Sequence, residues 1–120
     1  MAETVALQPV DHARMAVDVA SEGQASDVTM LDVREISGFA DYFVILTAES
    51  TRQMESLRES LEKDLETSGA VLHHREGSPQ GGWVLLDFGD LVIHLFAPSE
   101  REYYHLEGAW PGAVEVVRLQ

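Results

Sequence analysis

Two apolar runs in the C-terminal half of the chain are separated by only two residues. They are "WVLLDF" (83–88) and "LVIHLFA" (91–97), with Gly89 and Asp90 between them. Because glycine readily adopts positive φ and aspartate favours turns, this spacing predicts a tight β-hairpin. A third run, "DYFVILTA" (41–48), is apolar on both faces and predicts a central strand that is covered on both sides. These strands require a layered fold around a sheet.

Helical periodicity is found between the runs 41–48 and 83–88, and again before residue 41. Ser50 can cap a helix while Gln53, three residues later, completes a capping box, and Gly69 would end that helix. Its apolar stripe consists of Met54, Leu57, Leu61 and Leu65. Pro9 suits the first turn of an earlier helix that ends near Gly23. The apolar face of that helix consists of Ala13, Ala16, Val17 and Ala20.

Three further segments complete the predicted elements. Residues 27–35 and 70–75 are predicted to be strands, because β-branched and apolar residues predominate there. Ser99 and Glu102 have the spacing of a second capping box, with Pro98 just before it. We therefore expect a short third helix that ends near Gly108.

The order of these elements predicts the fold class. It is α/β (α+β), with a mixed sheet of about five strands flanked by helices in one domain over residues 1–120. Strand 41–48, helix 50–68 and strand 70–75 are expected to make a right-handed crossover. No structure is predicted for the tail, residues 111–120.

The acidic composition narrows the classes of partner. The chain has 21 acidic and 8 basic residues and a formal net charge of −13. That charge disfavours direct binding to DNA or RNA, since such binding depends mainly on lysine and arginine, and it suits a basic partner. An acidic surplus that only keeps the protein soluble is the alternative explanation. The absence of cysteine fits a reducing cytosol, and no segment approaches the ~20 apolar residues of a membrane span.

Five polar side chains are candidates for reactive groups. Asp87 and Asp90 could hold a divalent cation, but both are explained more simply by the hairpin turn. His94 lies within an apolar strand, where a buried imidazole with a hydrogen-bond partner is commoner than a metal ligand or a base. His73 and His74 would point to opposite faces of a strand and could not share one metal. The sequence therefore favours a scaffold over a catalytic or metal site.

Aromatic residues give a stronger indication of binding. Trp83 opens a predicted strand, and a second group lies in and beside the last helix: Arg101, Tyr103, Tyr104, His105 and Trp110. Tryptophan, tyrosine and arginine are enriched in interface hot spots. Tyr103 and Leu106 are expected to be core residues, whereas Trp83 and Tyr104 fit the core or an interface equally well.

Together these residues resemble a known family. "LDVREISGFADYFVILTAESTRQ" (31–53) and "GGWVLLDFGDLVIHLFAPSEREYYHLEGAW" (81–110) closely resemble the ribosomal silencing factor, or Iojap-like, family. The resemblance extends from about Ala13 to Trp110, a core of 13–110 followed by the tail 111–120. Its most specific parts are Asp41-Tyr42-Phe43, the helix start at Ser50, Arg52 and Gln53, the hairpin from Trp83 to Asp90, His94, and the segment from Arg101 to Trp110.

The resemblance implies a fold, a partner and a mode of action. Family members have a nucleotidyltransferase-like fold without catalysis, bind the large ribosomal subunit through ribosomal protein L-fourteen, and block its association with the small subunit when nutrients are scarce. The resemblance thus implies a translational repressor that is not an enzyme and forms a homodimer when free. The acidic net charge implies only minor contact with rRNA, and the sequence features above fit a cytoplasmic protein. Ala48 and Glu49 stand where nucleotidyltransferases carry Gly-Ser, which argues further against nucleotide binding.

The candidate partner-binding residues follow from both lines of reasoning. They are Trp83, Asp87, Asp90, His94, Arg101, Tyr104 and Trp110. No catalytic, metal-binding or cofactor-binding residue is predicted. The alternative is a metal-dependent nucleotidyl or phosphoryl transferase that would use Asp87, Asp90 and Asp41.

Overall fold

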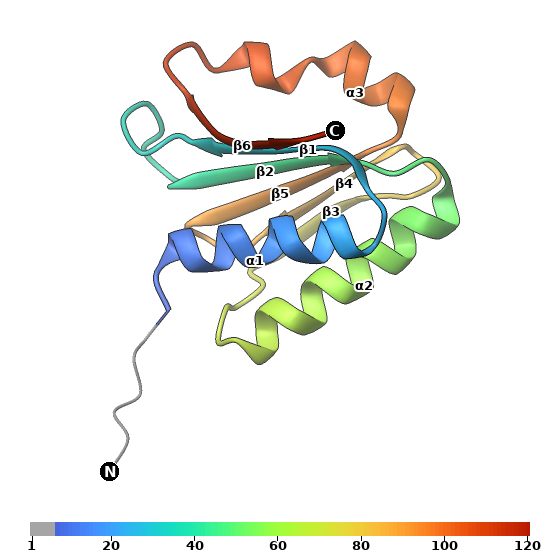
Figure 1. The fold of residues 1–120 in the computed structure, drawn as a ribbon, viewed down its shortest axis with the longest axis horizontal. Helices are drawn as coiled ribbons and strands as arrows, with labels where there is room; N and C mark the ends of the chain where they lie inside the picture. Colours follow the sequence, from blue (N-terminus) through green and yellow to red (C-terminus); the bar gives the residue numbers. More distant parts are fainter. Residues whose placement is uncertain (1–6) are drawn as a thin grey trace.

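The computed structural model describes residues 7–120 (Figure 1). The helices are α1 (Pro9–Glu22), α2 (Thr51–Thr67), α3 (Pro98–Tyr104) and the 3-10 helix η1 (Leu106–Ala109). The strands are β1 (Ser26–Asp32), β2 (Tyr42–Thr47), β3 (His74–Ser78), β4 (Trp83–Asp87), β5 (Leu91–Phe96) and β6 (Val114–Leu119). The part of the predicted single domain formed by residues 1–6 lies outside the described residues.

The strands form one mixed sheet in the order β3-β4-β5-β2-β1-β6. Strands β2 and β5 are parallel, from Tyr42 opposite Leu91 to Thr47 opposite Phe96. The four other pairs of neighbouring strands are antiparallel. The predicted α+β class with a mixed sheet is confirmed. The expected five strands become six, because residues in the unassigned tail form β6 along the edge of β1.

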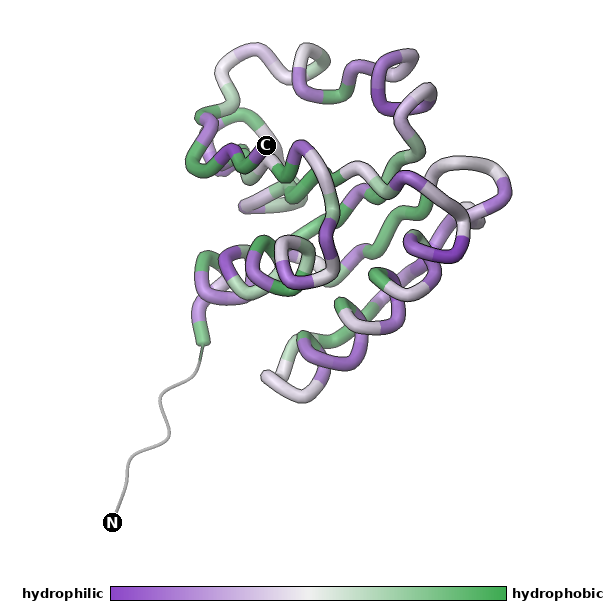
Figure 2. Tube along the Cα trace, turned by 45° about the vertical axis from the view of Figure 1, so that its right-hand side comes forward, coloured by the Kyte–Doolittle hydropathy of each residue, from purple (hydrophilic) through white to green (hydrophobic). Residues whose placement is uncertain are grey.

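Helices α1 and α2 cover one face of the sheet (Figure 1). The predicted stripe of α2 is buried, with exposed fractions of 2% or less for Met54, Leu57, Leu61 and Leu65. Ala13, Ala16 and Ala20 of α1 are fully buried because small side chains let this helix approach the strands and α2 closely. Apolar residues are concentrated in the central strands, and polar and apolar residues alternate along the helices (Figure 2).

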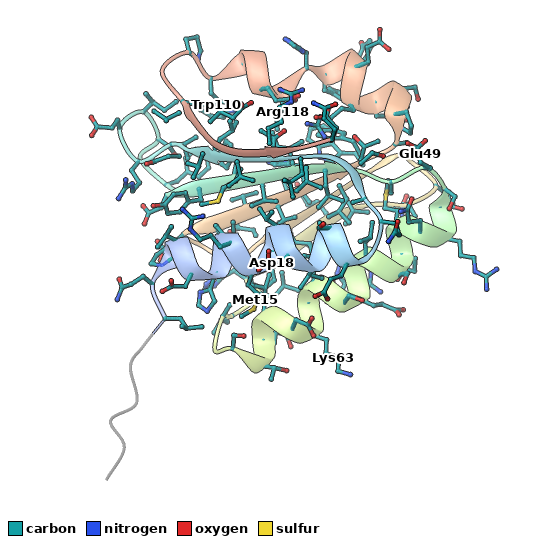
Figure 3. The ribbon with its side chains drawn as sticks, viewed as in Figure 1. Met15, Asp18, Glu49, Lys63, Trp110 and Arg118 are labelled. Carbon is teal, nitrogen blue, oxygen red and sulfur yellow. The ribbon has the colours of Figure 1, made fainter. Side chains whose placement is uncertain are left out.

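The opposite face of the sheet is covered only in part. Helices α3 and η1 lie over it, on the side away from α1 and α2 (Figure 1). A second core cluster forms beneath them from Leu31, Val33, Ala40, Phe43, Ile45, Val92 and Phe96, with Trp83, Leu85, Leu106, Trp110 and Ala113 packed against it. We call residues 98–110, which include α3 and η1, the C-terminal segment. The Trp110 side chain points from this segment toward the sheet, whereas Lys63 of α2 points into solvent (Figure 3). The candidate site lies on this half-covered face.

Two predictions about local structure were wrong. The strand expected at 70–75 begins only at His74. The crossover from β2 through α2 leads to β3 at the edge of the sheet, and β5 and β4 lie between β2 and β3. The expected capping box of α3 is absent, because Ala97 is the N-cap and the Ser99 hydroxyl donates to Glu100 instead. Pro98 occupies the first turn, where its missing N–H costs nothing.

Candidate functional site

Aromatic rings cross the half-covered face of the sheet in a continuous series. We call this surface the aromatic face and define it by Phe39, Phe43, Trp83, His94, Phe96, Tyr104 and Trp110. Ring centroids are 4.5 Å apart for Trp83 and Tyr104, and 5.3 Å apart for Phe43 and Trp110. His94 lies in the middle of the series, 5.6 Å from Phe43 and 5.9 Å from Trp83. Strands β2, β4 and β5 and the C-terminal segment all contribute to it.

Trp83 lies beside a groove at one end of this surface. It is half-buried and lines a shallow groove of about 370 Å³ together with Glu76, Gly77 and Leu85. Its ring packs against Phe96 on one side, with centroids 4.9 Å apart. Trp83 therefore has a fixed inner face and an accessible outer part, a combination found in interface hot spots.

His94 is a buried imidazole with a hydrogen-bond partner, as predicted. It is 5% exposed, and its Nδ1 accepts the indole N–H of Trp83 at 3.2 Å. Burial lowers the pKa of His94 from 6.5 to about 4, because desolvation penalises the charged ring. The ring is thus neutral at pH 7.

Asp87 and Asp90 belong to the hairpin turn. The side chain of Asp87 accepts the N–H of Gly89 at 2.7 Å, and Gly89 has the positive φ, 88°, that the sequence predicted. The backbone carbonyl of Asp90 accepts N–H groups of Asp41 and Tyr42 at 2.8 and 3.0 Å. Within residues 7–120, no group of three or more histidine or acidic side chains could hold a metal ion. The predicted tight turn at Gly89 is confirmed.

The candidate residues are divided between the two ends of the β4–β5 hairpin. Trp83 starts β4, whereas Asp87 ends it and Asp90 precedes β5. The structure therefore brings Trp83, His94 and Tyr104 together and leaves the two aspartates at the far end of the hairpin.

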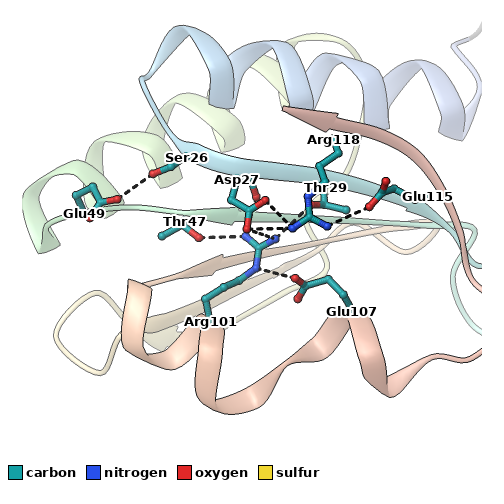
Figure 4. A network of polar contacts seen from close by, with 9 residues as sticks. All are labelled: Ser26, Asp27, Thr29, Thr47, Glu49, Arg101, Glu107, Glu115 and Arg118. Carbon is teal, nitrogen blue, oxygen red and sulfur yellow. Dashed lines mark hydrogen bonds and ion pairs between the residues drawn. The ribbon is translucent and has the colours of Figure 1, made fainter. Parts of the chain in front are cut away.

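Arg101 lies inside the domain (Figure 4). Nη1 of its guanidinium donates to the carbonyl of Asp27 at 2.8 Å and to the hydroxyl of Thr47 at 3.1 Å. Nη2 donates to Thr29 at 3.2 Å, and Nε donates to a Glu107 carboxylate oxygen at 3.2 Å. At 7% exposure, this side chain has little surface left for a partner. It instead connects α3 and η1 to β1 and β2.

One of the two tyrosines of α3 differs from expectation. Tyr103 is 81% exposed, so its prediction as a core residue was wrong. Tyr104 is 45% exposed and its ring packs against Trp83 at a tilt of 46°, which places it at the surface with one side packed. Leu106 is half-buried against the second core cluster. The helix ends at Tyr104, and the next residue, His105, adopts the left-handed conformation with φ 45°.

Sequence reasoning missed two parts of the surface. Phe39, in the loop between β1 and β2, is 63% exposed and lies 6.2 Å from Trp110 between ring centroids. Leu85 lines the groove beside Trp83. The alternation of half-buried and buried residues along β4 could have identified Leu85 as sharing a face with Trp83. The position of Phe39 depends on the loop, for which the sequence gives no equivalent signal.

The fold and this surface define a class of protein: an α+β domain whose half-covered sheet face carries aromatic rings that are buried at Phe43, His94 and Phe96 and exposed at Phe39 and Tyr104. Residues 6–120 match the model of a family described as "Ribosomal silencing factor during starvation". The chain belongs to the ribosomal silencing factor family.

Individual relatives agree with this assignment. A ribosomal silencing factor from Halalkalibacterium halodurans is 36% identical over 103 residues, which are 86% of this chain and 88% of the relative. A mouse protein named "Mitochondrial assembly of ribosomal large subunit protein 1" is 33% identical over 80% of this chain and 43% of its own length. A crystal structure of a protein from Chromobacterium violaceum superposes with a TM-score of 0.83 at 27% identity, covering 92% of this chain and 94% of the other.

No helix of the described residues is long and apolar enough to cross a membrane.

Proposed function

We propose that this protein is a cytoplasmic translational repressor that binds the large ribosomal subunit. It contacts ribosomal protein L-fourteen and occupies the surface that the small subunit needs, so that the subunits do not join under nutrient limitation. Membership of the ribosomal silencing factor family supports this role. The printed name of the mouse relative also refers to the large subunit. The mechanism is steric and requires no catalytic group, metal or cofactor.

The observation that carries this proposal is the half-covered aromatic face. Apolar aromatic surface left in water is unfavourable, and surfaces of this kind usually bind a partner. The outer parts of Trp83 and Tyr104 would form the centre of the contact, with Trp110 farther along the same face. A net charge of −13 favours a basic ribosomal protein over the phosphate backbone of rRNA or DNA.

The remaining candidate residues have supporting roles in this proposal. His94 and Arg101 are buried, so they act by holding Trp83 and the C-terminal segment in place. Asp87 shapes the hairpin turn through its bond to Gly89. Asp90 is exposed at that end of the hairpin and would add negative charge at the margin of the interface.

The free protein is further proposed to form a homodimer, as the family resemblance implies. Sedimentation velocity over a wide dilution series tests this point independently of the ribosome. A single monomeric species at every concentration would contradict it.

Co-sedimentation with purified large subunits tests the repressor function directly. The wild-type protein should pellet with large subunits and, at saturation, reduce the joining of added small subunits. Trp83→Ala and Tyr104→Ala should each weaken binding by about tenfold or more, since truncation of a hot-spot aromatic residue costs at least ~1–2 kcal/mol. The dissociation constant is obtained by titrating labelled protein at fixed subunit concentration.

Val71→Ala is the matched control for these variants. Val71 is 62% exposed and lies in the loop before β3, away from the aromatic face. Its truncation should leave the affinity unchanged, and circular dichroism should show that all three variants fold. Unimpeded joining at saturating wild-type protein would exclude the repressor function, whereas normal binding by both aromatic variants would place the interface elsewhere.

A further inference from the structure

The hydrogen bond between Trp83 and His94 connects two neighbouring strands diagonally. Across the β4–β5 pair, Trp83 lies opposite Phe96 and Leu85 lies opposite His94. The indole of Trp83 therefore leans along the sheet to reach the imidazole two positions away, where Nε1 donates to Nδ1 at 3.2 Å. This contact determines the direction in which the half-exposed indole ring points.

The imidazole is itself held by aromatic neighbours. Phe96 lies nearly parallel to it, at an interplanar angle of 7° and a centroid distance of 6.1 Å. Phe43 meets it edge to face at 79°. Because His94 is 5% exposed and enclosed by these rings, it offers a fixed acceptor to Trp83.

The bond also determines the chemical form of His94. A neutral imidazole has one accepting nitrogen and one N–H, whereas a protonated ring has two donors and cannot accept. Since Nδ1 accepts from the indole, the proton of His94 lies on Nε2. Burial, which lowers the pKa of His94 to about 4, maintains this neutral form at physiological pH.

Trp83 has a second support from the C-terminal segment. The ring of Tyr104 lies 4.5 Å away at 46°, so α3 contacts the indole from a different side. The groove beside Leu85 remains open next to it. The orientation of Trp83 thus depends on its hydrogen bond to His94 and on ring contacts with Phe96 and with Tyr104 of α3.

We propose that His94 is a positioning residue of the docking surface. By accepting the indole N–H through Nδ1, it fixes Trp83 in the orientation that the basic protein partner recognises, without touching that partner itself. This inference rests on the proposed function, since it assigns Trp83 to the docking contact. Pre-orienting an interface side chain removes part of the entropy cost of binding, so loss of the bond should weaken the complex.

Hydrogen exchange of the Trp83 indole proton tests the bond independently of any partner. The protein has two tryptophans, and Trp110→Phe assigns their two indole signals in ¹⁵N-labelled samples. His94→Phe keeps an aromatic ring but removes the acceptor, and it should accelerate exchange of the Trp83 proton by about tenfold. His94→Asn retains an acceptor close to the Nδ1 position and should restore slow exchange to within about threefold of the wild type.

Val92→Ala is the control for general disturbance of packing. Val92 is buried in the second core cluster and lies two residues before His94 on the same face of β5, but it takes no part in the hydrogen bond. In Val92→Ala, the Trp83 indole proton should exchange at the same rate as in the wild type. Equal acceleration in Val92→Ala and His94→Phe would show that core loosening, and not the missing acceptor, is responsible.

The binding experiment uses large subunits and a double-mutant cycle. His94→Phe should weaken binding about five- to tenfold, and His94→Asn should recover most of that loss. In a Trp83→Phe background, which lacks the indole donor, His94→Phe should cause no further loss. An undiminished further loss in that background would overturn the positioning role.

The two readouts separate failure of this inference from failure of the proposed function. If the wild-type protein does not bind large subunits, the proposed function fails, and with it the role of His94 in docking, although exchange still decides whether the bond exists. If the wild type binds but His94→Phe leaves the exchange rate or the affinity unchanged, the proposed function stands and the positioning role is overturned.

Discussion

At the scale of single residues, His94 makes the stability of the protein depend on pH. Its pKa is about 4 in the folded protein, compared with 6.5 ordinarily. Between these values the unfolded chain binds more protons, so the free energy of unfolding rises with pH from about 4 to 6.5 and is independent of His94 above that range. Because the side chain is 5% exposed, the whole interval corresponds to about 3 kcal/mol.

Urea unfolding of wild type and His94→Asn at pH 7 and pH 5 measures this contribution. From pH 7 to pH 5, the free energy of unfolding of the wild type should fall by about 2 kcal/mol more than that of the variant. About 1.5 pH units of this interval lie below 6.5, the ordinary pKa of histidine. His74→Asn, at an exposed site, is the control and should retain the wild-type dependence. Identical pH dependence in wild type and His94→Asn would show that the buried ring does not govern this loss.

At the scale of elements, the start of α2 is fixed by more than a helix cap. Ser50 accepts the N–H of Gln53 at 3.0 Å, which is the first half of the predicted capping box; the reciprocal bond from Gln53 to the N–H of Ser50 is not made. The Gln53 amide oxygen then accepts the N–H of Glu49, one residue before the cap. The same amide donates to the carbonyls of Gly23 and Gln24, at the end of α1, at 3.1 and 2.9 Å. Gln53 therefore connects the two helices of the covered face.

Gln53→Ala should destabilise the protein more than Ser50→Ala. Loss of the Ser50 cap costs about 1 kcal/mol, whereas Gln53→Ala removes three hydrogen bonds of a partly exposed group and should cost about 2 kcal/mol. Equilibrium denaturation with a shared m-value measures both. A smaller loss for Gln53→Ala than for Ser50→Ala would mean that the connection to α1 contributes little.

The accuracy of the element predictions followed the regularity of each sequence pattern. The stripe of α2 and the apolar run of β2 were placed correctly, since burial on one stripe or on both faces leaves a clear periodicity. Strand β3, "HREGS", is exposed throughout and has no such pattern. Strand β6 is likewise mostly exposed and is defined by its pairing with β1, far away in sequence. Local periodicity cannot predict strands of this kind.

The candidate site shows the same limit at the level of side chains. Trp83 and Tyr104 were selected for their chemistry and lie together at the surface, whereas Arg101 was selected for the same reason and lies inside. The burial of Arg101 depends on Thr29 and Thr47, which the sheet brings beneath α3. A single sequence contains no pattern that relates a helical arginine to threonines on two distant strands.

At the scale of the whole molecule, the net charge of −13 should accelerate encounter with a basic partner. Raising the ionic strength from about 0.05 to 0.5 M should lower the association rate constant with isolated L-fourteen about tenfold, and should change the dissociation rate constant much less. Stopped-flow tryptophan fluorescence measures both constants.

Glu59→Lys/Glu66→Lys provides a variant for this experiment. Both glutamates are exposed on α2, outside the aromatic face. Reversing them makes the net charge less negative and should flatten the dependence of the association rate constant on salt, with little change in dissociation. An association rate constant that is insensitive to salt in the wild type would mean that charge has no part in partner selection.

The parallel pairing of β2 with β5 has a consequence for the kinetics of folding. The two strands are roughly fifty residues apart in the chain, and helix α2 lies between them. The β4–β5 hairpin is local and can form on the microsecond scale, but the central pair must first close a long loop. A folding intermediate with the hairpin alone would already hold Trp83 near His94 and would still lack Phe43 beneath them. The aromatic face is therefore completed only at the slow, long-range step that joins the two halves of the sheet.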